Sequence, residues 1–339
     1  MNLSPTAPIP IHHGRSKVQI FQDSSSNLNS SSGALSPQPQ LSPSPPDFIP
    51  QEEHVISRIG NYVLLEEVGP KVFKSINTFN HHECICKVTQ IQQYRETFAP
   101  TFQLGPHPHI SNVEEVLLGE TQAYVMFPAT YGDMHTFVRR KRKLREREAA
   151  PLFRQMVEAV AHCHAHGVVL RDLKLRKFVF RNEERTEVVL EGVEDAHILE
   201  SPDNDSLSDK HGCPAYVSPE ILLTSGSYSG KAADVWSLGV ILYTMLVGRY
   251  PFHDSDPAAL FTKIRLGQYQ LPDSMSTQAK SVIHSLMRVD PSERLTAEEI
   301  LGHPWFRNAS LPHRSSRRAD SKIPDQLVPD FFIAEDGIA

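Results

Sequence analysis

The sequence predicts an α+β fold with two lobes, a small strand-rich lobe and a large helical lobe, between two disordered tails. Short runs of β-branched and apolar residues between 62 and 127 are typical of strands. From 148 to 166 apolar residues recur at three- and four-residue spacing, as on one face of a helix. Residues 1–50 contain eleven Ser and nine Pro, and such a segment cannot offset its ordering entropy by burying apolar surface. We therefore expect a disordered region at 1–56, a folded domain at 57–307 and a flexible tail at 308–339.

The composition is that of a globular protein, with 40% hydrophobic and 22% charged residues. A net charge of −6 provides no general attraction to nucleic acid. The start of the sequence lacks the apolar run of a secretory signal, so we expect the four cysteines to be free thiols in a reducing compartment. The most apolar segment, 235–247, is too short to span a bilayer. These features predict a cytosolic or nuclear location without membrane contact, and composition does not separate the two compartments. We expect a monomer that is present in the nucleus and the cytoplasm.

In the small lobe, strands are predicted at 62–68, 72–76 and 83–88, followed by a hairpin at 113–118 and 121–127. Lys87 lies near the end of the third strand, and Glu96 is the nearest acidic candidate to pair with it. Pro100, Gly105, Pro106 and Pro108 interrupt the intervening segment, which favours a short or distorted helix. Lys87 is therefore expected to be unpaired, or to have a partner elsewhere.

The large lobe should begin with the helix at 148–166, which has Pro151 in its first turn and ends before Gly167. Its last turn holds His162, Cys163, His164 and His166, but this spacing does not place all four on one face, so no metal site is predicted. The basic run at 139–147 is either an exposed helix face or a nuclear-localisation or nucleic-acid patch. Because no aromatic residues are interleaved with it, direct nucleic-acid binding is not predicted.

The stretch 170–178 resembles the catalytic loop of a protein kinase, which reads His-Arg-Asp-Leu-x-x-x-Asn. In a kinase the Asp accepts the proton of the substrate hydroxyl, and the Asn binds magnesium. Asp172 is present here, but Leu170 replaces the His and Lys177 replaces the Asn. Lys87 likewise occupies the place of the nucleotide-pairing lysine. We interpret Lys87 and Asp172 as vestigial catalytic residues.

Two further parts of a kinase site are altered. Gly192, Val193 and Glu194 stand where a kinase has Asp-Phe-Gly, whose Asp binds magnesium. Asp195 is a possible substitute ligand, although it lies three residues late. The phosphate-covering loop needs several glycines, whereas the turn at 69–71 holds a single one. None of the parts that handle metal and phosphate is therefore complete.

The structural residues of the large lobe are retained by contrast. Glu220 ends a segment that resembles the kinase Ala-Pro-Glu motif, and Arg294 is its expected ion-pair partner. Asp234 occupies the place of the aspartate that anchors the catalytic loop. A kept scaffold with lost chemistry is typical of a binding module on a kinase fold.

The chain resembles the Tribbles pseudokinases in the stretches 170–178 and 205–220 and in its lack of Asp-Phe-Gly. The stretches 153–156 and 189–191 lean toward the third Tribbles paralogue. The resemblance implies a protein without kinase activity and without a cofactor, in which ATP binding is weak or absent and magnesium is not required. It also implies a tail motif that binds a constitutive-photomorphogenesis-type E3 ubiquitin ligase, formed by Asp325, Gln326, Leu327, Val328, Pro329 and Asp330.

The partners that the resemblance implies are C/EBP-type and other bZIP transcription factors as substrates, and MAP kinase kinases and Akt-type kinases as inhibited enzymes. A candidate kinase-binding segment comprises Ile300, Leu301, His303, Pro304, Trp305 and Phe306. The same segment also fits a closing helix and core plug of an ordinary kinase. The chain is thus predicted to regulate MAPK signalling and transcription as an adaptor. The alternative is an atypical, weakly active, metal-independent Ser/Thr kinase that uses Lys87 and Asp172.

Overall fold

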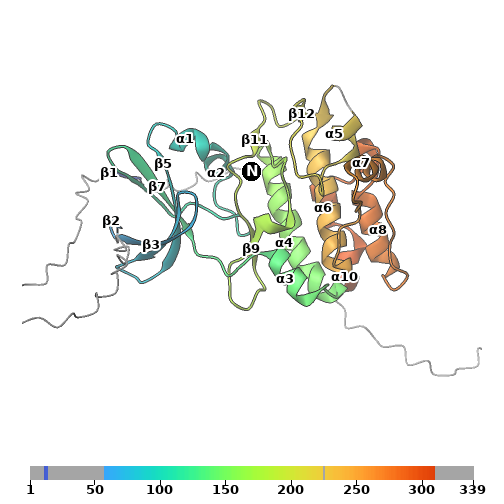
Figure 1. Cartoon of the computed structure of the whole chain (residues 1–339), viewed down its shortest axis with the longest axis horizontal. Helices are drawn as coiled ribbons and strands as arrows, with labels where there is room; N and C mark the ends of the chain where they lie inside the picture. The colour runs from blue at the N-terminus through green and yellow to red at the C-terminus, as the bar shows by residue number, and fades with distance from the viewer. Residues whose placement is uncertain (1–10, 14–56, 224–225, 310–339) are drawn as a thin grey trace, which may run out of the picture.

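Seven strands form the sheet of the small lobe in the computed structural model, which describes residues 11–13, 57–223 and 226–309 (Figure 1). Their order in the sheet is β1-β6-β7-β5-β4-β3-β2. All neighbours pair antiparallel except β1 and β6, which run parallel. The strands are β1 (Ile11–His13), β2 (Ser57–Ile59), β3 (Tyr62–Gly69), β4 (Val72–Asn77), β5 (Glu83–Gln90), β6 (Glu115–Leu118) and β7 (Gln122–Pro128).

The two faces of this sheet carry separate apolar clusters, because side chains alternate along each strand. Two short helices, α1 (Tyr94–Thr97) and α2 (Ala99–Leu104), cover one face, where Phe98 packs with Phe127. The predicted interruption of this segment is therefore present, and Gly105 ends α2 with a φ of 62°. The other face buries Ile59, Tyr62, Leu64, Cys84, Cys86 and Met126.

One short strand in the N-terminal region was not predicted. Residues 11–13, inside the range expected to be disordered, form β1 and pair with Val116, Leu117 and Leu118 of β6. A Pro-, Ser- and His-rich segment gives no periodic signal, so this pairing with a distant strand could not be read from the local sequence. The remainder of 1–56 lies outside the described residues.

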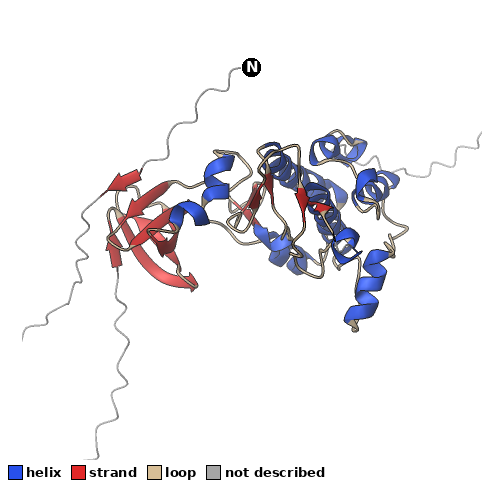
Figure 2. Cartoon of the chain, turned by 90° about the horizontal axis from the view of Figure 1, so that it is seen from above, coloured by secondary structure: helices blue, strands red, loops and turns tan. Residues whose placement is uncertain are grey.

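The large lobe is helical and lies on the opposite side of the molecule from the sheet (Figures 1 and 2). Its helices are α3 (Met134–Lys141), α4 (Glu146–Ala165), α5 (Pro219–Leu223), α6 (Gly230–Val247), α7 (Pro257–Arg265), α8 (Thr277–Leu286), α9 (Ala297–Leu301) and α10 (Pro304–Ala309). Short strands and 3₁₀ turns connect them, namely β8 (Val168–Val169), η1 (Leu175–Lys177), β9 (Phe178–Phe180), β10 (Val188–Leu190), β11 (His197–Ile198), β12 (Ser206–Leu207), β13 (Tyr228–Ser229) and η2 (Pro291–Glu293).

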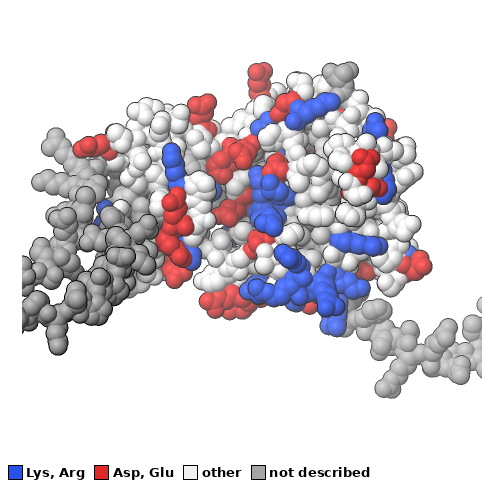
Figure 3. Space-filling model, in the orientation of Figure 1, with Lys and Arg blue, Asp and Glu red and all other residues white. Residues whose placement is uncertain are grey.

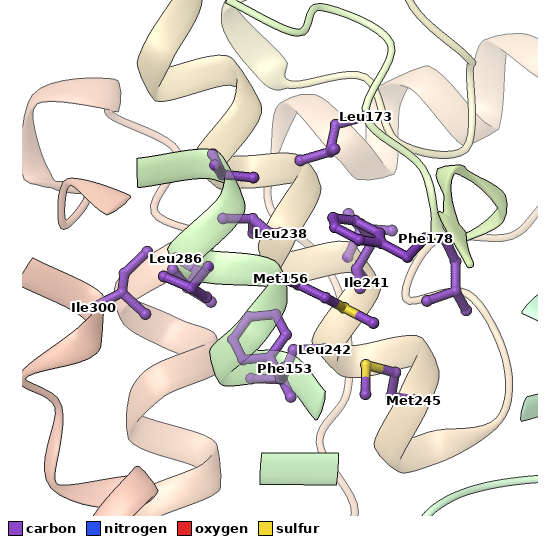
Figure 4. Packing of buried hydrophobic residues seen from close by; sticks show 14 of the residues in the cluster. Phe153, Met156, Leu173, Phe178, Leu238, Ile241, Leu242, Met245, Leu286 and Ile300 are labelled. Atoms are coloured by element: carbon purple, nitrogen blue, oxygen red, sulfur yellow. The ribbon is translucent and has the colours of Figure 1, made fainter. Parts of the chain in front are cut away.

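The core of this lobe forms around α6, which packs between α4 and α8 (Figure 4). Phe153 and Met156 of α4 meet Leu238 and Leu242 of α6 in this core. By length and composition α6 could cross a membrane, but 83% of it is buried inside the lobe, as in the core helix of a globular protein. The four cysteines are free thiols. This architecture confirms the predicted α+β fold with a small strand-rich lobe and a large helical one.

Candidate functional site

The loop between β8 and η1 lies at the junction of the lobes and is held in place by Asp234 of α6. The buried Asp234 carboxylate accepts hydrogen bonds from the backbone N–H groups of Leu170 at 2.8 Å and Arg171 at 2.9 Å. His164 Nε2 lies 2.9 Å from the same carboxylate, a contact that the sequence did not indicate. These bonds stabilise the positive φ of 58° at Arg171. The large lobe therefore fixes the loop conformation through Asp234.

A second buried carboxylate, Glu220 of α5, meets Arg294 just after η2. Two parallel bonds join them, Nη1 to Oε1 at 2.6 Å and Nη2 to Oε2 at 2.7 Å. The Arg294 side chain is 1% exposed and the Glu220 side chain 8% exposed. This bidentate pair fixes the segment that precedes α6.

Lys87 of β5 pairs with Glu194, whose Oε1 lies 2.6 Å from Lys87 Nζ. The nearest acidic candidate, Glu96, is exposed on α1, and Glu194 is the partner elsewhere in the chain. Because α1 is only four residues long, it cannot present a carboxylate to the cleft as a full helix would. Lys87 Nζ also lies 4.7 Å from the centre of the Phe127 ring. The ion pair connects the small lobe to the segment after β10.

Lys177, which replaces the kinase Asn, contacts Gly192, which replaces the kinase Asp. Lys177 Nζ donates a hydrogen bond to the carbonyl oxygen of Gly192 at 2.7 Å. Next to it, Lys174 Nζ lies 2.6 Å from Asp172 Oδ2, so the vestigial base is occupied by an ion pair. Val193 is buried at 3% exposure and serves as core.

The segment after Gly192 offers no ready replacement for the missing magnesium-binding aspartate. Asp195, the possible substitute ligand, is exposed, and its carbonyl oxygen accepts a hydrogen bond from Arg171 Nη2 at 2.8 Å. Arg171 Nη1 is paired with Asp209 at 2.6 Å. Arg171 thereby joins the loop to Asp195 and to Asp209. Sequence reasoning missed this role because both acceptors lie far along the chain.

Magnesium, which protein kinases bind at this place, does not fit the residues present. Position 177 supplies an ammonium group, and position 192 supplies no side chain. Burial is the main cause that lowers the pKa of Lys177, while the charges of Asp172 and Asp195 oppose this. Burial also raises the pKa of Glu191, which precedes Gly192. Among the described residues, no cluster of three or more His, Cys, Asp or Glu has the geometry to hold a metal ion.

The turn between β3 and β4 is tight. It passes through Pro70 and Lys71, and Lys71 has a φ of 59°. The Lys71 N–H donates to Glu67 Oε1 at 2.9 Å. A turn of this length does not fold over the cleft as a glycine-rich loop does.

Comparison with known proteins identifies the chain's relatives. The protein kinase domain family matches residues 71–306. Tribbles homolog 2 of Canis lupus familiaris is 56% identical over 340 residues, which covers 99% of this chain and 98% of the relative. The chain belongs to the Tribbles family. Tribbles homolog 1 of Homo sapiens is 56% identical over 278 residues, covering 81% of this chain and 73% of that protein. Tribbles homolog 3 of Mus musculus is 50% identical over 305 residues, covering 88% and 85% respectively.

The Tribbles prediction is thus confirmed at the level of the family. The identities do not single out the third paralogue, and the lean toward it stays a prediction. The kinase match lies within the predicted folded domain at 57–307. The predicted ligase-binding segment at 325–330 lies outside the described residues.

Half of the candidate kinase-binding segment of this Tribbles protein lies in the core. Ile300, Trp305 and Phe306 are 0%, 0% and 3% exposed. Trp305 Nε1 donates to Glu146 Oε2 at 3.0 Å, which ties α10 to the start of α4. These three side chains cannot contact a partner while the domain is folded. Of the other members, Leu301 and His303 are partly exposed and Pro304 is exposed.

The basic run at 139–147 is exposed, except for Leu144 and the partly buried Glu146. Figure 3 shows Lys and Arg gathered along the lower edge of the large lobe, near α3. The run ends α3, turns at Arg142 with a φ of 67° and enters α4. Because the run is held as two helix ends and a turn, it matches the exposed-helix interpretation better than an extended localisation peptide.

Proposed function

We propose that this Tribbles protein is a pseudokinase adaptor. Its kinase-like domain binds C/EBP-type and other bZIP transcription factors, and its tail recruits a constitutive-photomorphogenesis-type E3 ubiquitin ligase. The contact of Lys177 with the Gly192 carbonyl carries this proposal, because it joins two positions that hold magnesium in a kinase. A domain with its scaffold kept and its metal ligands replaced is suited to binding rather than to phosphoryl transfer.

The tail supplies the ligase contact in this proposal. Val328 and Pro329 can fill an apolar pocket in an extended peptide, while Asp325 and Gln326 fix its register. The last described helix, α10, ends at Ala309, so a tether of 15 residues, 310–324, precedes the motif. A tether of this kind raises the effective concentration of the ligase beside a bound substrate.

The second activity in the proposal is inhibition of MAP kinase kinases and Akt-type kinases by direct binding, in the nucleus and cytoplasm. For the candidate segment, the burial of Trp305 and Phe306 restricts a kinase contact to Leu301, His303 and Pro304. Loss of kinase binding in a variant of Trp305 would therefore report damage to the core. Pro304→Ala is the informative substitution, because Pro304 is exposed.

Deletion of residues 325–330 tests the adaptor proposal. We expect ligase binding by the full chain to fall at least about a hundredfold, roughly 2.7 kcal/mol, with C/EBP-type substrate affinity unchanged. Deletion of 316–321 removes an equally long piece of tether and should leave ligase affinity within about threefold. Both affinities can be measured by isothermal titration calorimetry. Unchanged ligase affinity after deletion of 325–330 would contradict the proposal.

The alternative function, a weakly active and metal-independent Ser/Thr kinase, would use Lys87 and Asp172. Both side chains are paired within the chain, with Glu194 and Lys174 respectively. ATP would have to displace at least the Lys87 pair. Phosphate transfer that is present in the purified chain and lost in Asp172→Ala would support this alternative.

A further inference from the structure

Three lysine side chains of the cleft are bound to acceptors of the chain itself. The contacts are Lys87 to Glu194 at 2.6 Å, Lys174 to Asp172 at 2.6 Å and Lys177 to the Gly192 carbonyl oxygen at 2.7 Å. The first two are ion pairs between side chains. The third differs, because its acceptor is a neutral backbone group and the ammonium charge is not neutralised by that contact. Lys177 is therefore the cleft lysine whose direct acceptor carries no charge.

The position of this ammonium is defined by the fold. Lys177 ends η1, and its backbone N–H donates to the Lys174 carbonyl at 3.0 Å. Its own carbonyl accepts from the Glu191 N–H at 2.7 Å. The main chain is thus fixed on both sides, and the side chain spans from the place of the kinase Asn to that of the kinase Asp. In a kinase, metal ions lie between these two residues.

We propose that the Lys177 ammonium is a built-in cation that takes the position of the metal ion and excludes divalent cations from the cleft. A second positive charge brought within a few ångströms would meet strong repulsion in this half-buried site. Asp172, Glu194 and Asp195 are the acidic groups whose charges act on Lys177. The first two already have lysine partners, so few negative charges remain for a metal to use.

This inference goes beyond the adaptor proposal, because it concerns the cation selectivity of the cleft and not its partners. A cleft with its own cation has a charge that does not vary with the magnesium concentration. The arrangement around Gly192 is then set by the chain itself. It would hold or fail whether or not the tail recruits a ligase.

The test uses Mn²⁺ as the probe and the full chain in four substituted forms. Lys177→Arg keeps the positive charge, and Lys177→Asn restores the residue type of the kinase loop. Lys177→Asn combined with Gly192→Asp restores both kinase ligands. Lys263→Asn is the matched control, because Lys263 forms a surface ion pair with Asp254 at 2.8 Å, away from the cleft. Binding is followed by the electron paramagnetic resonance signal of free Mn²⁺ and by thermal unfolding.

We expect wild type, Lys177→Arg and Lys263→Asn to share the same weak background binding of Mn²⁺. Lys177→Asn with Gly192→Asp should bind Mn²⁺ at least about tenfold more tightly and gain a few degrees in Tm when Mn²⁺ is added. Lys177→Asn alone should lie between these limits. Equal Mn²⁺ affinity of wild type and the folded double variant would overturn the inference.

Gly192 has a φ of 70°, and an aspartate there is strained, although Asp tolerates this conformation better than most residues. If circular dichroism shows that the double variant is unfolded, the comparison of Lys177→Arg with Lys177→Asn decides. Tighter Mn²⁺ binding by Lys177→Asn supports the built-in cation. Equal binding by these two variants contradicts it.

Discussion

The ion pair of Glu220 and Arg294 is the point where single side chains contribute most to the large lobe. Arg294 also donates to the carbonyl oxygens of Arg288 at 2.8 Å and Ala232 at 2.9 Å. Its guanidinium lies 5.1 Å from the centre of the Trp236 ring. One arginine therefore holds α5, the start of α6 and the segment before η2 together. Removing its carboxylate partner would leave a buried, uncompensated charge.

Glu220→Ala should therefore destabilise the domain by about 3–5 kcal/mol. The free energy of unfolding in urea, followed by tryptophan fluorescence, measures this. Glu293→Ala is the control, because Glu293 is 61% exposed and 4.0 Å from Arg288, and it should cost at most about 0.5 kcal/mol. Equal effects of the two substitutions would show that the buried pair has no special importance.

At the residue scale, the sequence predicted the residues that belong to motifs better than it predicted contacts between residues far apart in the chain. Asp234, Glu220 and Arg294 could be placed because each belongs to a motif with a fixed role. The partner of Lys87 could not, because Glu194 lies 107 positions away and only the fold brings the two together. The contact of Lys177 with a carbonyl oxygen was also hidden, since backbone acceptors carry no sequence signal.

At the scale of elements, the broken helix of the small lobe contacts the large lobe through stacked histidine rings. His107, which follows α2, stacks on His162 of α4 with ring centres 4.4 Å apart, and His166 lies 4.0 Å beyond. His162 Nε2 also lies 2.8 Å from the Leu104 carbonyl oxygen. Burial is the main cause that lowers the pKa of His107 to about 4. The nearby charges of His162, His109, His166 and Arg181 lower it further.

This stack predicts a loss of stability in mild acid. The pKa of His107 is about 4 in the folded chain, below its ordinary value of 6.5. As the pH decreases, the His107 ring therefore becomes protonated in the unfolded chain before it does in the folded chain. The free energy of unfolding falls as pH decreases from about 6.5 to about 4. We expect a loss on the order of 1–3 kcal/mol over this range, reduced by the partial exposure of the ring.

Urea unfolding at a series of pH values measures this effect. His107→Gln removes the titrating ring and should flatten the profile between pH 6.5 and 4. His253→Gln is the control, because His253 is exposed and outside the stack, and its profile should follow that of wild type. A His107→Gln profile as steep as wild type would exclude His107 as the source.

Elements with strong local patterns were predictable, and those that depend on distant contacts were not. The helix expected at 148–166 is α4, Glu146–Ala165, and the alternating strands fall close to their predicted places. Pro100 and Gly105 correctly indicated the interrupted helix, because they act on the local backbone. β1 was missed, since three residues carry no period and their pairing depends on β6.

At the scale of the whole molecule, contacts within the chain join the two lobes. Leu104, the last residue of α2, and Ile110, between α2 and β6, are buried in the core of the large lobe. The ion pair of Lys87 with Glu194 joins the lobes on the side of the cleft. Because these contacts lie within the chain, they require no ligand between the lobes. This arrangement suits a domain that presents surfaces and binds partners.

The pairing of β1 with β6 has a consequence for the behaviour of truncated forms. An uncovered strand edge offers free N–H and C=O groups to the sheet of a neighbouring molecule. β1 lies along that edge of the small-lobe sheet, so a chain that begins at residue 57 would present β6 to solvent. We expect such a chain to self-associate reversibly as its concentration rises, whereas a chain that lacks only residues 1–10 keeps β1 and stays monomeric. Sedimentation velocity over a range of concentrations distinguishes them, and a monomeric 57–339 fragment throughout would mean that β1 does not protect the sheet.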